Sequence, residues 1–252
     1  MINLEHKIST WLSSYLKNNN LDSFVIGISG GIDSAVTSTL CAITGLKTYV
    51  IVMPIHQKKD ETDRGLEHCG WLKKKYPNVE HIKVDLTSTF DHFKSVFPSN
   101  FDNKLALANS RARIRMSSLY LIAGNKNGLV VGTGNKIEDF GVGFFTKYGD
   151  GGVDISPIAD LMKSEVYKLG KTLGIIDSII NAKPTDGLWD DERTDEDQLG
   201  ASYDQLEWAM NFDEDETSLT ENQRNILSVY KQHRNKNLHK MKNIPVFKND
   251  AE

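Results

Sequence analysis

Four short apolar runs, separated by segments long enough for helices, constrain the fold of this 252-residue chain more than any other feature. The runs cover residues 24–28, 49–53, 81–84 and 129–131, and each is typical of a buried strand. Strands that alternate with helices predict an α/β protein with a doubly wound, parallel sheet flanked by helices. Because ligands of such a sheet bind beside the carboxyl ends of its strands, we expect a site where these runs end.

Helical patterns fill the segments between the runs. Residues near 4–18 have apolar side chains at helical spacing and predict an amphipathic helix that ends at three consecutive asparagines. A chain of this length can form one α/β sheet, so residues 1–252 are expected to form a single domain. The other helical patterns cover residues 35–43, 63–75, 105–123, 163–173, 203–210 and 221–232.

One segment departs from this alternation. Residues 184–198 carry seven Asp or Glu residues but only two sizeable apolar residues, Leu188 and Trp189. This composition predicts a flexible acidic loop over about 184–200, which is either a solvated surface loop or a lid over an active site.

Charge and apolar content limit the possible partners. A formal net charge of −4 argues against a nucleic-acid-binding surface, which needs clustered Lys and Arg. No stretch approaches the roughly 20 apolar residues of a membrane span, and the first residues lack the apolar core of a signal peptide. A cytoplasmic location without membrane contact is therefore expected. Cys41 and Cys69 have no metal-binding spacing and are expected to be reduced core or surface thiols.

A glycine-rich turn follows the first apolar run and has the form of an anion site. Glycines let the backbone approach phosphate oxygens, and free N–H groups at the start of the next helix favour negative charge. The turn lacks the lysine of a Walker A loop and the spacing of Rossmann glycines, whereas Asp33 offers a hard oxygen ligand for Mg²⁺. A tight turn with Asp33 or Ser34 as an ordinary helix cap is the alternative. The candidate phosphate-binding residues are Gly27, Ile28, Ser29, Gly30, Gly31, Ile32, Asp33 and Ser34.

Two further segments carry candidate site residues. Arg111, Arg113 and Arg115 are spaced by two residues on a predicted helix and must point in different directions, and an inward one suits a phosphate or carboxylate. The run that ends at residue 131 continues into a Gly-Thr-Gly-Asn turn, which returns Thr133 and Glu138 to the expected crevice. Glu138 is either a second carboxylate for Mg²⁺ or a residue of a helix start.

Residues 145–157 form the third candidate segment. They contain three glycines, two carboxylates and one lysine, without hydrophobic periodicity. Turns favour Gly and Asp, but a plain surface turn needs fewer of them, so the segment is a candidate for ligand binding. Lys163 follows just inside a predicted helix.

Taken in order, five motifs resemble those of the NAD synthetase family from residue 4 to about 245: GISGGIDS, NSRARIRM, VVGTGNKIED, FFTKYGDGGVDISPIADLMK and the late LHK. The first motif alone resembles the SGGxDS signature of the ATP pyrophosphatases, which implies a Rossmann-like sheet of the adenine nucleotide alpha hydrolase type. The resemblance implies a homodimeric ligase that amidates deamido-NAD with ammonia and Mg-ATP, through an adenylate, and releases AMP and pyrophosphate. Glutamine-fed members carry an additional amidase domain, for which this chain has no room, so ammonia is the expected nitrogen source.

The resemblance also implies roles for single residues. The turn at residues 27–34 would bind the phosphates of ATP, and Asp33 and Glu138 would hold Mg²⁺. Asp150 would capture ammonia and would form the catalytic set with Asp33 and Lys163. Further contacts to ATP would come from Thr133, Lys163 and Thr185, and contacts to deamido-NAD from Arg113, Lys147, Asp154, His239 and Lys240.

The chain differs from the family pattern at Gly134-Asn135-Lys136 and in the tail after Lys240. Two alternatives stay open: another adenylating ATP pyrophosphatase, and a protein that binds a nucleotide without catalysis. Release of pyrophosphate only when deamido-NAD is added would separate the three.

Overall fold

A parallel four-stranded sheet organises the chain in the computed structural model, which describes residues 3–185 and 194–249. The strands are β1 (Ser23–Gly27), β2 (Lys47–Val52), β3 (Val79–Lys83) and β4 (Gly128–Val130), in the spatial order β3-β2-β1-β4. The predicted parallel sheet is thus confirmed, with strand ends shifted by one or two residues. Since the order reverses beside β1, the switch point of the sheet lies between β1 and β4.

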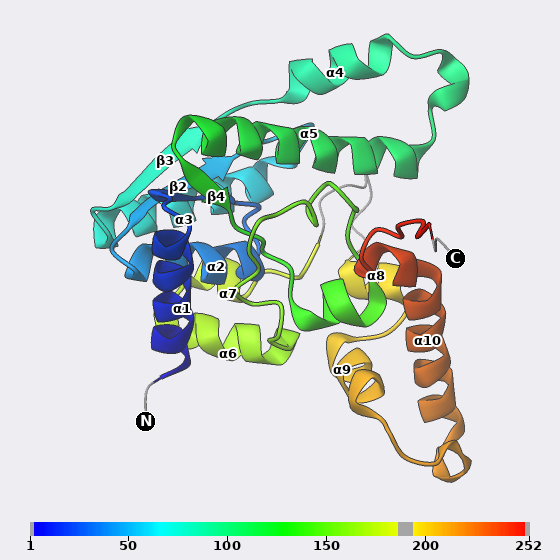
Figure 1. Cartoon of the computed structure of the whole chain (residues 1–252). Helices are drawn as coiled ribbons and strands as arrows, with labels where there is room; N and C mark the ends of the chain where they lie inside the picture. The colour runs from blue at the N-terminus through cyan, green and yellow to red at the C-terminus, as the bar shows by residue number, and fades with distance from the viewer. Residues whose placement is uncertain (1–2, 186–193, 250–252) are drawn as a thin grey trace.

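Helices cover both faces of the sheet (Figure 1). Phe24 and Ile26 of β1 point into one cluster of buried side chains and Val25 points into another, because successive side chains of a strand alternate between faces. The first face is covered by α1 (Leu4–Asn18), α2 (Ile32–Ile43), α3 (Lys59–Lys75), α6 (Lys163–Leu173) and α7 (Asp177–Ile180). The second face is covered by α4 (Thr87–Ser95) and α5 (Lys104–Asn125), and the short helix η1 (Ser99–Phe101) joins these two.

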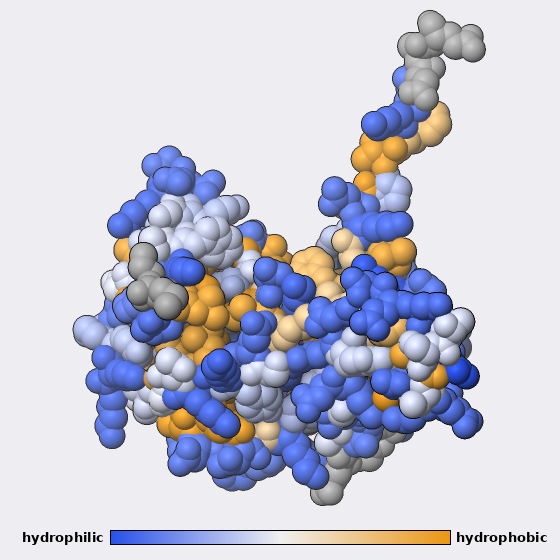
Figure 2. Space-filling view, turned by 90° about the horizontal axis from the view of Figure 1, so that it is seen from below, coloured by the Kyte–Doolittle hydropathy of each residue, from blue (hydrophilic) through white to orange (hydrophobic). Residues whose placement is uncertain are grey.

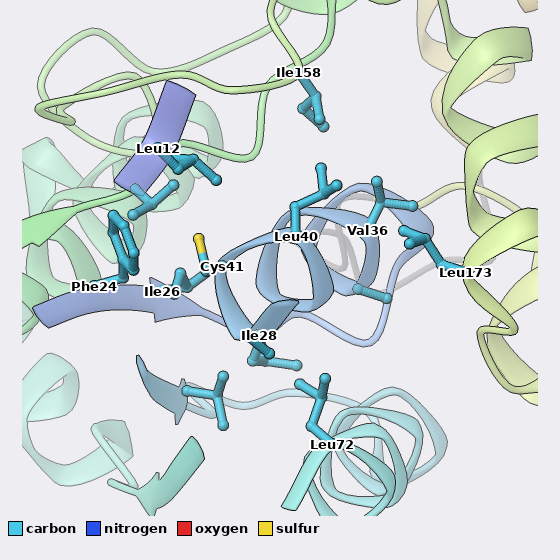
Figure 3. Close-up of a cluster of buried hydrophobic side chains, with 14 of the residues drawn as sticks. Leu12, Phe24, Ile26, Ile28, Val36, Leu40, Cys41, Leu72, Ile158 and Leu173 are labelled. Carbon is cyan, nitrogen blue, oxygen red and sulfur yellow. The ribbon is translucent and has the colours of Figure 1, made fainter. Parts of the chain in front are cut away.

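The largest core cluster lies on the first face. Figure 3 shows Cys41 of α2 beside Ile26 of β1, with Leu12 of α1 on the same side and Leu40 of α2 below Ile158. The apolar face of α1 that the sequence predicts is buried here, at Leu12 and Leu16 among others. Cys41 and Cys69 are both buried, and burial raises the pKa of the Cys69 thiol to about 12, so both are unreactive core thiols.

A third cluster joins the helices near the C-terminus. It is formed by the π-helix η2 (Lys136–Val142), α8 (Asp195–Leu199), α9 (Tyr203–Asn211) and α10 (Glu221–Met241), with η3 (Glu216–Ser218) between the last two. In Figure 1 these elements lie beside the sheet, and α9 and α10 extend away from it. Helix α10 is nine residues longer than the pattern at 221–232 predicts, because its polar second half packs on η2 through Arg234 and Asn237.

Residues 195–199, at the end of the segment that the sequence predicts to be a flexible acidic loop, form helix α8 instead. Thr194 accepts a hydrogen bond from the backbone N–H of Asp197, and its own N–H donates to the Asp197 carboxylate, which caps α8. Asp195 is buried. Residues 186–193, which include Asp186, Asp190, Asp191 and Glu192 of that prediction, lie outside the described residues.

The described C-terminal residues form an extended segment that follows α10. Figure 2 shows this segment projecting from the body of the molecule, with exposed apolar residues among polar ones. Ile244, Val246 and Phe247 are the large apolar side chains of the segment, and all three are exposed. None of the helices within residues 3–185 and 194–249 is long and apolar enough to cross a membrane.

Candidate active site

A cavity of about 720 Å³ opens at the carboxyl ends of β1, β2 and β4. It is lined by the turn after β1, the turn after β4, helix α5 and the end of α10. Nearly all of the candidate residues line this one cavity: Gly27, Ile28, Ser29, Gly30, Gly31, Ile32, Asp33, Ser34, Arg113, Thr133, Glu138, Lys147, Asp150, Lys163, Thr185, His239 and Lys240. A switch point brings them together because both turns leave neighbouring strands there.

The turn after β1 is held open toward the cavity by its own side chains. The Ser34 hydroxyl donates to the carbonyl of Gly31 at 3.0 Å and accepts the N–H of Ser29 at 3.3 Å. Gly31 is the N-cap of α2 and has no side chain that could cap this helix end. The first N–H groups of α2 therefore lie beside the cavity without a side-chain cap, as an anion site requires.

Lys163 lies between two carboxylates at the centre of the cavity wall. Its Nζ is 2.6 Å from Oδ2 of Asp33 and 2.9 Å from Oε1 of Glu138. The side chain of Lys163 is only 3% exposed, whereas Asp33 is 17% and Glu138 15% exposed. The three residues come from α2, η2 and α6, so their meeting joins all three elements.

Two residues that the sequence analysis did not select complete this group. Asn135 is fully buried and donates from Nδ2 to Oδ1 of Asp33 at 3.0 Å, while its Oδ1 accepts the N–H of Glu138. The hydroxyl of Tyr203 donates to Oε1 of Glu138 at 2.6 Å. Tyr203 follows the Ser202 cap of α9, a position with no local signal for a role in the site.

Burial and charge act on this group in opposite directions. Burial raises the pKa of Asp33 above its ordinary value, and the neighbouring Lys163 only partly opposes this. Burial acts the same way on Glu138, but Lys163 and the hydrogen bond from Tyr203 outweigh it, so the pKa of Glu138 is lowered. Although burial disfavours the Lys163 ammonium, the two carboxylates raise its pKa, which keeps it charged.

A second acidic region of the cavity lining contains Asp150 of the Gly-rich segment 145–157 and Asp139 of η2. Oδ1 of Asp150 accepts the backbone N–H of Thr146 at 3.1 Å, and burial raises the pKa of Asp150. Asp139, which the sequence analysis did not select, also lines the cavity, and burial raises its pKa well above the ordinary value. Lys240 donates to the carbonyl of Phe145 at 2.6 Å, near both carboxylates, and burial lowers its pKa.

The three arginines of α5 point in different directions, as their spacing predicts. Arg111 lies over the ring of Phe90, whereas Arg113 donates to the carbonyl of Lys147 at 3.3 Å. Arg115 donates to the carbonyl of Met53 at 2.9 Å, and burial lowers its pKa to about 10. Arg113 and Arg115 both line the cavity.

The substrate-binding candidates near the C-terminus meet the Gly-rich segment. Nζ of Lys147 donates to the carbonyl of His239 at 3.2 Å, which connects the end of α10 with residues 145–157. Asp154, by contrast, lies outside the cavity lining and is exposed. Its two oxygens accept the Tyr120 hydroxyl and the Val130 N–H, each at 2.8 Å.

Fold and cavity together define an α/β protein of the nucleotide-binding class, with a glycine-rich turn after its first strand at the switch point of the sheet. Within that class the chain belongs to the NAD synthase family, whose model matches residues 4–249. It is 40% identical over 207 residues to the NH3-dependent NAD(+) synthetase of Alkaliphilus metalliredigens, which covers 80% of this chain and 83% of that relative. A relative with the same description from Mesoplasma florum is 39% identical over 203 residues, or 78% of this chain and 79% of the relative.

Two solved structures share the fold along almost the whole chain. The NMN synthetase from Francisella tularensis has a TM-score of 0.86 and 32% identity, and covers 98% of this chain and 97% of its own. The NH3-dependent NAD synthetase from Campylobacter jejuni has a TM-score of 0.78 and 29% identity, and covers 97% and 98%. The resemblance found in the sequence motifs is thereby confirmed at the level of the family.

Proposed function

We propose that this chain makes NAD by joining ammonia to the nicotinate carboxylate of deamido-NAD at the expense of ATP. The observation that carries the proposal is the single cavity shared by the phosphate turn, the Asp33–Lys163–Glu138 group and the Gly-rich segment 145–157. It offers an anion site for ATP beside a region rich in polar groups for a second substrate. Family membership supports the same reaction.

The first step activates a carboxylate, which is a poor electrophile because of its charge. A carboxylate oxygen of deamido-NAD attacks the α-phosphorus of ATP, the bond from that phosphorus to the bridging oxygen breaks, and pyrophosphate leaves with the electron pair. The first N–H groups of α2 and the Lys163 ammonium lower the repulsion between the two anions. Contacts of Thr133 and Thr185 to ATP belong to the same proposal.

The described residues fit a Mg²⁺ ion at Asp33 and Glu138. Oxygens of both carboxylates lie within 3 Å of Lys163 Nζ, so the two side chains are close together, and both are partly exposed and line the cavity. No group of three or more metal-binding side chains occurs in the described residues. Since Mg²⁺ is commonly held by one or two carboxylates plus phosphates and water, two suffice. When bound, the ion would offset the charge of the triphosphate.

The second step forms the amide. The bound ammonium ion first gives up a proton to solvent. Ammonia then attacks the acyl carbon of the adenylate, the bond to the AMP oxygen breaks, AMP leaves with the electron pair, and the nitrogen loses a second proton as the amide forms. Asp150 is buried in the cavity wall and binds the ammonium ion that delivers the nitrogen. Arg113, Lys147, His239 and Lys240 line the side of the cavity where deamido-NAD would lie.

A homodimer is part of the proposal. Large apolar side chains are exposed along α4, η1 and α5, and the rings of Phe93, Phe97 and Phe101 follow one another at 5.1 and 6.5 Å. A contiguous apolar surface of this kind favours association. Asp154 accepts a hydrogen bond from Tyr120 of α5. Any contact between Asp154 and deamido-NAD would therefore be made at this face of the molecule, outside the cavity lining. Light scattering of the purified chain tests the dimer, and Phe97→Asp should shift it toward the monomer.

A second candidate substrate is nicotinic acid mononucleotide, which would be amidated to NMN. The observation that favours it is the 32% identity with the Francisella tularensis NMN synthetase over 98% of this chain. Both substrates present the same nicotinate carboxylate and differ in the adenylyl half, so the chemistry would be unchanged.

One assay separates these possibilities. The purified chain is supplied with Mg-ATP, either ammonium or glutamine, and either deamido-NAD or nicotinic acid mononucleotide. We expect NAD, AMP and pyrophosphate in equal amounts with deamido-NAD and ammonium. NMN as the preferred product would favour the second candidate. Release of pyrophosphate when neither acid is added would favour another ATP pyrophosphatase. No release of pyrophosphate under any of these conditions would favour a protein that binds a nucleotide without catalysis. The cytoplasmic location stays a prediction.

A further inference from the structure

Arg64 of α3 lies against the phosphate turn and belongs to neither the sequence motifs nor the roles proposed above. Gly30 approaches α3 so closely that an added Cβ atom would lie 2.6 Å from the carbonyl oxygen of Glu61 and 3.4 Å from the Cβ of Arg64. This contact fixes the second turn of α3 beside the turn that would hold the phosphates. Arg64 lines the same cavity.

The guanidinium of Arg64 is held only weakly where it lies. Its Nη1 donates to Oδ2 of Asp60 at 2.9 Å, but the Asp60 side chain is 68% exposed while that of Arg64 is 21% exposed. An ion pair with so exposed a partner contributes little to stability. In addition, Nε of Arg64 is buried and has no hydrogen-bond partner among the described residues. The guanidinium therefore retains capacity for an anion.

The charge balance of the cavity calls for a further cation near Gly30. The phosphate turn contains no lysine, and the nearby Lys163 is already neutralised by Asp33 and Glu138. ATP brings several negative charges to this turn, and most of them lie on the β- and γ-phosphates. Arginine suits these groups because its planar fork donates two parallel hydrogen bonds.

We infer that Arg64 binds the β- and γ-phosphates of ATP and holds the pyrophosphate after it leaves. The guanidinium exchanges Asp60 for the phosphates. When the bond between the α-phosphorus and the bridging oxygen breaks, the electron pair stays on pyrophosphate, and Arg64 offsets the charge that develops there. This inference rests on the proposed function, since it assumes that the turn holds ATP.

Equilibrium binding of inorganic pyrophosphate, ATP and AMP, each with Mg²⁺, tests the inference without turnover. Arg64→Gln should weaken the binding of pyrophosphate and ATP by about tenfold or more, because a charged hydrogen bond is lost. Binding of AMP, which lacks both outer phosphates, should change less than about twofold by the same reasoning. Arg64→Lys keeps the charge but loses the fork, so an intermediate loss is expected.

The matched control is Lys59→Gln. Lys59 also lies in the first turns of α3 and pairs with Asp63, but its side chain is 89% exposed and does not line the cavity. This control removes the same charge and should leave all three affinities unchanged. Wild-type affinity of Arg64→Gln for pyrophosphate, or an equal loss for AMP, would overturn the inference. A wild-type chain that binds pyrophosphate but makes neither NAD nor NMN would overturn the proposed function instead, and the Arg64 comparison would still stand.

Discussion

Asn135 and Asp33 are joined by a hydrogen bond of 3.0 Å, from Nδ2 to Oδ1, across 102 residues of sequence. Asn135 also accepts the N–H of Glu138 at its other side-chain atom. One buried amide therefore holds the carboxylate of Asp33 and the backbone of Glu138, the two residues that contact Lys163. It also ties the turn after β4 to the turn after β1, which are the two halves of the switch point.

Asn135→Asp should damage both stability and activity. An aspartate cannot donate to Asp33 and places a third carboxylate beside it, so a loss of about 1–3 kcal/mol in the free energy of unfolding is expected. Turnover should fall because the carboxylates lose their fixed positions. Urea denaturation and kcat/KM measure the two effects. Asn100→Asp makes the same change at an exposed position and should leave both values unchanged. A fully stable, fully active Asn135→Asp protein would contradict the positioning role.

Asp33→Asn and Glu138→Gln should both lower turnover by about 100-fold or more, because each removes charge that acts on the phosphates. Both should also destabilise the fold, because each leaves the buried Lys163 ammonium with one carboxylate partner instead of two. The loss should be larger for Glu138→Gln, because the pKa of Glu138 is lowered in the folded state, whereas burial raises the pKa of Asp33. Thermal unfolding and NAD formation measure the two effects. Asp160→Asn, at a carboxylate that is 95% exposed, is the control.

The strands and the glycine-rich turn after β1 could be predicted from the sequence because their signals are local. Val25 and Ile26 belong to a strand buried on both faces, and such a strand is a continuous apolar run. The turn after this strand is recognisable by its glycines. The segment with Arg111, Arg113 and Arg115 and the segment 145–157 are recognisable by their high content of Arg, or of Gly and carboxylates. The family was recognisable on the same motifs and is confirmed, whereas the roles of the single residues stay predictions.

The other features of the fold and of the candidate site depend on contacts between residues far apart in the sequence, which local sequence patterns do not predict. Tyr203 reaches Glu138 across 65 residues, and only the packing of α9 on η2 brings them together. Helix α4 escaped prediction because Phe90 is its one buried residue, so it lacks a continuous apolar face. Helix α8 was hidden by its acidic composition, although the capping pair Thr194 and Asp197 marks its start. Asp154 carries a family motif and yet lies outside the cavity of this chain.

Gly30→Ala should cost more stability than an ordinary glycine substitution at positive φ. Gly30 has φ of +87° and would place its new Cβ atom 2.6 Å from a backbone carbonyl oxygen, which cannot move without shifting α3. Gly174 has φ of +72° with no atom within 4 Å of the added Cβ, so Gly174→Ala reports the backbone conformation alone, about 1–2 kcal/mol. Gly30→Ala should exceed this by roughly 1–3 kcal/mol and should also weaken pyrophosphate binding. Equal losses in the two variants, measured by urea denaturation, would show that the contact with α3 is not tight.

His68 should make the fold less stable in mild acid. It is buried between Ser38, to which its Nε2 lies 3.0 Å away, and Trp71, on which its ring stacks, and burial lowers its pKa to about 4. The unfolded chain binds a proton at this residue below about pH 6.5, whereas the folded chain does not until about pH 4. The contribution of His68 to the free energy of unfolding is therefore complete above its pKa in the unfolded chain. It is lost as the pH falls toward its pKa in the folded chain, by on the order of 3 kcal/mol. Urea denaturation across this window should give a shallower dependence on pH for His68→Gln than for the wild type. His6→Gln, at an exposed histidine of α1, should retain the wild-type dependence, and parallel curves for all three proteins would exclude His68 as the source.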